Sequence, residues 1–329
     1  MRAVWFERQG PASEVLRIGE RPTPRAAAGE VRVRLHASGV NPADTNRRAG
    51  RGYVMEGPAV IPDSDGAGIV DEVGAGVDPA WLGKRVWLYN GQRGGRVDGT
   101  AAEWIALDAG LVAPLADGTS FAEGACLGIP CMTAHRCVHL RADLAGAAVL
   151  VTGGAGAVGH YAVQWAKRAG ARVATTVSSP DKAAHAATAS PDLVIDYRRE
   201  DVAGRLRDFA GPGGVDHVVD VDFGGNLATS LAAIAVNGSI AYYATKGAPT
   251  PALPAADLMR RNVSIHAVLL NNAPLAARRR AQADIAAALA DRGLRHAVSA
   301  VFPLARTADA HDAVEACTKR GTVVVDCRA

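Results

Sequence analysis

The chain has 329 residues, of which 49% are hydrophobic and 21% are charged, and its formal net charge is +3. A charge this small and this scattered predicts neither a nucleic-acid groove nor a site for a membrane surface. No apolar stretch approaches the roughly 18–20 residues that cross a bilayer, and the N-terminus lacks a signal-peptide pattern, so we expect a cytosolic protein.

The first part of the chain is predicted to be rich in β-strands. Residues 30–37 alternate between apolar and polar side chains, which is typical of a half-buried strand. Residues 69–74, 84–89 and 99–107 are similar short runs bounded by glycine and proline. We therefore expect a compact, irregular β-domain in this half of the chain.

From Ser120 onward the pattern changes. Ser120 and Glu123 form a helix-capping pattern, and strands then alternate with helices. The expected strands are 147–152, 172–177, 193–196, 215–221 and 238–243, and the expected helices are 158–169, 182–189, 202–209 and 226–234. This alternation predicts an α/β domain with a parallel sheet covered on both faces. The remaining chain is mixed, with strands expected at 263–269 and 321–326 and helices at 275–291 and 308–318.

The cysteines predict neither a disulfide framework nor a metal site. Their number is odd, they are dispersed along the chain, and no C-x-x-C pair is present. We expect all of them to be small buried hydrophobic groups. They are Cys126, Cys131, Cys137, Cys317 and Cys327.

A glycine-rich segment is the strongest local signal. Gly154, Gly156 and Gly159 satisfy G-x-G-x-x-G between an expected apolar strand and an expected helix. Such a turn brings backbone N–H groups and a helix N-terminus close to a pyrophosphate. The segment therefore predicts a dinucleotide-binding site.

The end of the next strand favours NADPH over NADH. An NAD site usually has an acid there, which binds the ribose 2′-hydroxyl, and this chain has none at that point. Ser179, Pro180 and Asp181 instead look like a helix N-cap, a proline at the first position and an acid facing the helix dipole. Lys182 is placed to neutralise a 2′-phosphate, with hydroxyl donors from Ser178 and Ser179. An inward-turned Asp181 would reverse this preference.

Several motifs together resemble the quinone oxidoreductase (ζ-crystallin-like) branch of the zinc-free medium-chain dehydrogenase/reductase superfamily. They are SGVNPAD (38–44), PDSDGAG (62–68), GIPCMTA (128–134), VIDYRRED (194–201) and GTVVV (321–325). They follow one another in the family's order along essentially the whole chain. The resemblance implies a GroES-like catalytic domain over residues 1–118, a Rossmann NADPH-binding domain over 119–262, and a C-terminal segment, 263–329, that returns to the first domain. It also implies a cleft between the domains, and a homodimer formed through Rossmann edge strands at residues 240–243.

The resemblance also implies functional residues. The pyrophosphate would be held by Gly154, Ala155, Gly156, Ala157, Val158 and Gly159, and the adenosine 2′-phosphate and adenine by Ser178, Lys182 and Tyr197. Asn226 would contact the cofactor, and Tyr243, Ala244, Thr245, Lys246, Ala267, Val268 and Leu269 would line its nicotinamide half. Asn41, Asp44 and Thr133 would lie near the nicotinamide ring. Asn41 as a simple turn residue and Tyr197 as a surface aromatic remain the alternatives.

The sequence predicts no metal. Zinc alcohol dehydrogenases place a cysteine where Asn41 stands and Gly-His-Glu where Ser64-Asp65-Gly66 stands, and residues 88–99 contain no cysteine for a structural zinc lobe. We expect His36, His135 and His139 to be hydrogen-bonded or exposed rather than metal-bound.

Three departures from the family pattern affect the predicted pocket. Asn46 replaces a cofactor-contacting tyrosine, His135 replaces the tyrosine of Thr-Ala-Tyr, and Asp63 replaces the glycine of Pro-Gly-Ser-Asp. They leave the shape of the pocket, and therefore the acceptor, open.

The predicted reaction is reduction of a quinone by NADPH without zinc, by transfer of a hydride or of single electrons to the conjugated carbonyl acceptor, with a dry cleft supplied by the protein. One alternative is an NADPH-dependent enone or enoyl (2-alkenal) reductase, and another is a non-enzymatic structural or RNA-binding relative. The intact glycine motif and Lys182 argue against the last. Tyr53, Asn41 and His135 are candidate proton donors.

Overall fold

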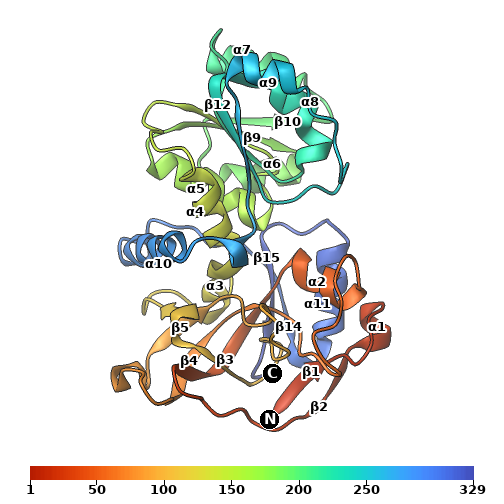
Figure 1. The fold of residues 1–329 in the computed structure, drawn as a ribbon, viewed down its shortest axis with the longest axis vertical. Coiled ribbons are helices and arrows are strands. Elements are labelled where there is room, and N and C mark those ends of the chain that lie inside the picture. The colour runs from red at the N-terminus through yellow and green to blue at the C-terminus, as the bar shows by residue number, and fades with distance from the viewer. The chain divides into compact units, whose positions relative to one another are not determined.

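The computed structural model describes all residues, 1–329, and divides them into two compact units (Figure 1). The first unit comprises residues 1–130 and 282–329, and the second comprises residues 131–281. The expected boundaries at 118/119 and 262/263 differ from these. Residues 119–130 stay in the first unit because α3 (Phe121–Gly124) packs on its sheet, and residues 263–281 stay in the second because β13 (Ser264–Ala267) extends the sheet there. No helix has both the length and the apolar character needed to cross a membrane.

The second unit is built on a six-stranded parallel sheet in the order β10-β9-β8-β11-β12-β13. Its strands are β8 (Ala148–Val151), β9 (Arg172–Val177), β10 (Leu193–Asp196), β11 (Val215–Asp220), β12 (Ile234–Tyr242) and β13. The chain moves outward from β8 to β10 and then returns to start again at β11. The strand order therefore reverses between β8 and β11, the place where ligands bind in sheets of this kind.

Helices cover both faces of this sheet (Figure 1). They are α4 (Met132–Val138), α5 (Ala157–Arg168), α6 (Pro180–Ala187), α7 (Val202–Ala210), α8 (Phe223–Ala233) and α9 (Ala255–Arg261). Leu150, Val218 and Ile240 from the central strands are fully buried, which explains why those strands read as continuous apolar runs. The predicted α/β domain is confirmed, although α9 was not foreseen.

The predicted dimer strand is wrong in its position. Residues 240–243 belong mainly to β12, which pairs with β11 on one side and β13 on the other. A strand bonded on both sides has no free backbone groups for a partner. The edges of this sheet are β10 and β13.

The first unit contains a seven-stranded sheet in the order β14-β15-β3-β4-β5-β7, with β6 also paired to β3, and a separate β1-β2 pair. The strands are β1 (Arg2–Trp5), β2 (Arg17–Glu20), β3 (Glu30–Val40), β4 (Asp65–Val73), β5 (Arg85–Leu88), β6 (Trp104–Asp108), β7 (Val112–Pro114), β14 (Val298–Pro303) and β15 (Thr322–Asp326). The C-terminal β15 lies between β14 and β3. Of the expected C-terminal segment, 263–329, residues 282–329 thus belong to the first unit, and residues 263–281 belong to the second.

The first unit also holds short helices. They are α1 (Ala12–Val15), α2 (Pro42–Ala49), α3 and α11 (Thr307–Glu315), while α10 (Leu275–Ala290) crosses the boundary between the units. The all-β reading missed α2, although its signals are in the sequence. Asn41 is its N-cap, Asp44 completes a capping box, and Gly50 ends the helix in the left-handed conformation at φ 74°.

The expectation for the cysteines is confirmed for Cys126, Cys131, Cys137 and Cys327, which are buried. It is wrong for Cys317, which is exposed. Cys317 lies just after α11 at a φ of 57°, a turn position where the chain leaves the core.

Candidate functional site

The glycine turn, residues 153–159, joins β8 to α5 and requires glycine for steric reasons. A Cβ on Gly154 would lie 2.1 Å from Thr175 Oγ1, and one on Gly159 would lie 2.3 Å from the carbonyl oxygen of Gly153. Gly153, which the motif did not include, has a φ of 70°, a conformation that disfavours other residues. The backbone is therefore packed closely on itself at this turn.

The N-terminus of α5 offers backbone donors to an anion. Gly156 is its N-cap and supplies no side-chain cap, and the first intrahelical donor is His160 N, 2.9 Å from Gly156 O. The preceding N–H groups of Ala157, Val158 and Gly159 therefore have no acceptor within the helix. With the positive end of the helix dipole, they fit a pyrophosphate, as the sequence predicted.

The end of β9 carries the predicted Lys182–serine group. Ser179 caps α6, with its Oγ accepting a hydrogen bond from Lys182 N at 3.3 Å, and Pro180 follows at the first helical position. Lys182 Nζ donates to Ser178 Oγ at 3.2 Å, and Asp181 is exposed in the first turn of α6. The predicted N-cap is confirmed, and an ammonium and a hydroxyl lie together where β9 ends.

Two further predicted cofactor residues lie near the strand ends of the second unit. Tyr197 follows β10, is 52% exposed, and its backbone N donates to Val177 O at 3.0 Å. Asn226, on α8, donates from Nδ2 to Oδ1 of the fully buried Asp220 at 2.8 Å. Asp220 also accepts from Thr152 Oγ1 at 2.9 Å, so it ties α8 to the strand that leads into the glycine turn. Asn226 is thus held by this network.

Most of the residues expected around the nicotinamide half of the cofactor line one cavity of about 680 Å³. It lies at the carboxyl ends of β12 and β13, and its lining includes Tyr243, Ala244, Thr245, Ala267, Val268 and Leu269 together with Arg136, Tyr242, His266 and Asn272. Lys246 is exposed, and its backbone N donates to Asp222 Oδ1 at 2.7 Å. Burial raises the pKa of Tyr243 well above its usual value, so its phenol remains a proton-bearing donor.

In the first unit, Asn41 and Asp44 belong to a polar cluster that also contains Ser64, Asp65 and Arg93. Asn41 Nδ2 donates to Asp65 Oδ2 at 2.8 Å, and Asn41 N donates to Asp44 Oδ2 at 2.8 Å. Asp44 Oδ1 accepts from Ser64 Oγ and from the Arg93 guanidinium, both at 2.8 Å. All five residues are buried, and their polar atoms bond mainly to one another, with Asp65 Oδ1 as an exception.

Tyr53 belongs to the first unit, as the cluster does, and Thr133 belongs to the second. The Cζ atom of Arg47 lies over the Tyr53 ring, 4.6 Å from the ring centroid. The backbone carbonyl of Tyr53 accepts a hydrogen bond from Gln9 Nε2 at 2.9 Å. Thr133 lies buried on α4, in the second unit, whereas Asn41 and Asp44 lie in the first. The expected catalytic set is therefore divided between the two units.

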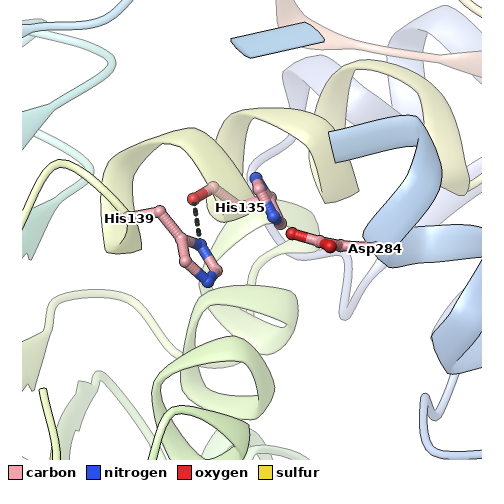
Figure 2. A group of neighbouring side chains, drawn as sticks. All are labelled: His135, His139 and Asp284. Atoms are coloured by element: carbon pink, nitrogen blue, oxygen red, sulfur yellow. Dashed lines mark hydrogen bonds between the residues drawn. The ribbon is translucent and has the colours of Figure 1, made fainter. Parts of the chain in front are cut away.

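The residues around Asn41 in the first unit do not form a zinc site. Asn41, Ser64 and Asp65 offer neither sulfur nor imidazole, and they are bonded to one another or to Asp44. On α4, the rings of His135 and His139 stack 4.0 Å apart, and His139 Nδ1 lies 2.8 Å from His135 O (Figure 2). We therefore assign no zinc-dependent step to the Asn41 region.

Sequence reasoning missed a buried pair beside the polar cluster. Asp63 has a φ of 72°, and its Oδ1 lies 3.0 Å from Nε2 of His311, on α11. Ser38 Oγ donates to the other carboxylate oxygen at 3.2 Å. The family pattern has glycine at this position, which suits the left-handed backbone. That substitution was the available signal, but nothing in the sequence pointed to His311.

Comparison with known proteins agrees with this architecture. The family model "Alcohol dehydrogenase GroES-like domain" matches residues 27–117, and "Zinc-binding dehydrogenase" matches residues 157–290. The quinone oxidoreductase of Pseudomonas aeruginosa is 30% identical, and the alignment covers 92% of each chain. A mycobacterial protein solved in complex with NADPH is 31% identical with a TM-score of 0.87, and an NAD-dependent alcohol dehydrogenase is 30% identical with a TM-score of 0.89, each aligned over 99% of both chains. The chain therefore belongs to the quinone oxidoreductase family, in the zinc-free branch of the medium-chain dehydrogenases/reductases.

Proposed function

We propose that this protein is an NADPH-dependent, zinc-independent quinone reductase. The observation that carries the choice of cofactor is the hydrogen-bonded pair of Lys182 and Ser178 at the end of β9, with Asp181 exposed beside it. A phosphate dianion there would meet a cation and hydroxyl donors, whereas a ribose 2′-hydroxyl would find no carboxylate at the strand end. This arrangement supports NADPH over NADH.

The chain's own residues would orient the reactants and exclude water. The N–H groups that begin α5 hold the pyrophosphate, and the cavity at the ends of β12 and β13 receives the nicotinamide half. Bound NADPH supplies a hydride, which together with one proton from water converts a quinone into its hydroquinone. A quinone suits a site without a Lewis acid because its reduced form is a stabilised, weakly basic phenolate.

The test is NADPH oxidation followed by absorbance, with 9,10-phenanthrenequinone and a conjugated enone as separate acceptors and NADH in parallel. Quinone-dependent turnover with NADPH and little with NADH is the expected result. Turnover with the enone alone would assign the protein to the alkene reductases. Tight NADPH binding without turnover on either acceptor would sink the proposed substrate.

We also propose that the protein is a homodimer and that β13 supplies the pairing edge in place of the residues first expected. Residues 264–267 are bonded to β12 on one side only, and they end the sheet. A free strand edge of this kind favours pairing with a second copy. Light scattering on Ile265→Pro, which disrupts the edge, should report monomers, and an unchanged dimer mass would contradict this interface.

A further inference from the structure

Three carboxyl groups are buried close together in the first unit, and they differ in their partners. Asp44 is bonded to the Arg93 guanidinium at 2.8 Å, and Asp63 lies 3.0 Å from His311 Nε2. Asp65, which is 0% exposed, has no cationic partner. The three acids therefore have two partners that can carry a positive charge, Arg93 and His311. Asp65 is bonded to neither of them.

The two carboxyl oxygens of Asp65 have very different surroundings. Both of its donors are amides, Asn41 Nδ2 and Ile129 N, and both reach the same oxygen, Oδ2, at 2.8 Å. Oδ1 is buried and has no hydrogen-bond partner. Gly128 packs directly on it, since a Cβ on that glycine would lie 2.2 Å from Oδ1. An ionised carboxylate would leave one charged oxygen bare against this wall, which is among the costliest arrangements in a protein interior.

Burial, and then the nearby charge of Asp44, raise the pKa of the Asp65 carboxyl well above its usual value. The hydrogen bonds from Asn41 and Ile129 and the charge of Arg93 lower this pKa, but they do not outweigh burial. Arg93 is already engaged by Asp44, and burial raises the pKa of the Cys126 thiol to about 12, so that side chain is neutral. Asp63, two residues before Asp65, forms a separate pair with His311.

We propose that Asp65 is a neutral carboxylic acid in the working enzyme, with its proton on Oδ1, and that it is a positioning residue for the polar cluster. It holds the Asn41 side chain through Oδ2 without adding a negative charge to the cluster. The positioning role rests on the proposed function, because reduction of a carbonyl acceptor builds negative charge on oxygen. With no zinc to neutralise that charge, an ionised Asp65 would oppose the reaction.

The protonation state is tested on the full chain without cofactor or quinone. Infrared spectra near neutral pH should contain the C=O band of a protonated carboxylic acid, which is lost in Asp65→Asn and kept in the control variant Asp78→Asn, which removes an exposed carboxyl group. Burial also raises the pKa of Asp63, so Asp63→Asn, which should keep the band, identifies Asp65 as its source if Asp65→Asn fails to fold. Absence of a protonated-carboxyl band from the wild type, or its survival in Asp65→Asn, would overturn the proposal whatever reaction the protein catalyses.

The positioning role is tested by the pH profile of kcat/KM. If only the neutral form works, wild-type kcat/KM falls tenfold per pH unit above the pKa of Asp65, and this alkaline limb disappears in Asp65→Asn. A wild type without the limb, or a variant that keeps it, would overturn the positioning role while leaving the infrared result intact. If quinone turnover is absent altogether, the proposed function fails and the infrared result still stands or falls by itself.

Discussion

The glycine turn of the second unit and the polar cluster of the first unit are built in opposite ways. The turn is made of backbone, and its N–H groups at the start of α5 have no acceptor within the helix. The cluster is made of side chains from α2, the start of β4 and the loop around Arg93, and those side chains bond to one another. The turn therefore offers free donors to an anion, whereas the side chains of the cluster hold one another in place.

The largest effect is expected from a substitution that breaks the ion pair between Asp44 and Arg93 in the polar cluster. Asp44→Asn removes the charge that pairs with Arg93, a guanidinium only 6% exposed, and so leaves a buried cation without its partner. We expect the free energy of unfolding to fall by about 3–5 kcal/mol, measured by urea denaturation. Asp78→Asn, which removes an exposed carboxylate that caps a short helix, is the control and should cost far less. Equal losses in the two variants would mean that the cluster's internal pairing is not what stabilises it.

The second prediction tests whether the site at Lys182 binds the 2′-phosphate of NADPH. Lys182→Ala should weaken NADPH binding by about 1.5–3 kcal/mol, roughly 10- to 150-fold, because a charge-assisted contact to the 2′-phosphate is lost. NADH, which lacks that phosphate, should bind with the same affinity as before. Calorimetric titration of both cofactors measures this, with Lys167→Ala, whose partner is Asp192, as the control. A parallel loss for NADH would show that Lys182 does not contact the 2′-phosphate.

The third prediction concerns the packing of the turn. Gly159→Ala places a methyl group 2.3 Å from a backbone oxygen, which has little room to move. We expect a loss of about 1–3 kcal/mol in the free energy of unfolding, together with weaker cofactor binding. Gly213→Ala is the matched control, since nothing lies within 4 Å of its added Cβ. Wild-type stability and affinity in Gly159→Ala would contradict the close-packed turn.

The fourth prediction uses the raised pKa of Asp65. Above the ordinary carboxyl pKa the unfolded chain has released this proton while the folded protein keeps it, so stability decreases as pH rises. The contribution is about 1.4 kcal/mol per pH unit until the pH reaches the raised pKa of the folded state. Asp65→Asn should remove this part of the slope of unfolding free energy against pH. An identical slope in wild type and variant would contradict it.

The same contrast explains what could be predicted from the sequence. The glycine turn, the Ser179 cap and Lys182 lie within thirty residues of one another, and each depends on local geometry that a motif records. The cluster joins residues that are far apart in the chain, such as Arg93 with Asp44 and Asp63 with His311. A single sequence carries no pattern for such pairs. The function of Asp44 in a capping box was readable, but its pairing with Arg93 was not.

The misplaced dimer strand has a similar cause. The sequence showed the strand at 238–243 and a later one at 263–269, but it did not show that the later strand adds to the same sheet and covers the earlier one. Strand order is a tertiary property. The resemblance implied only that edge strands pair in the dimer, and it did not identify which strand forms the edge of this sheet.

The most direct test of the central claim is the initial rate of quinone-dependent oxidation of NADPH against NADH, on one preparation of wild type and Lys182→Ala. The account predicts that wild type strongly prefers NADPH and that Lys182→Ala loses most of this preference through a higher KM for NADPH. Equal rates with the two cofactors in the wild type, or a preference that survives Lys182→Ala, would contradict it.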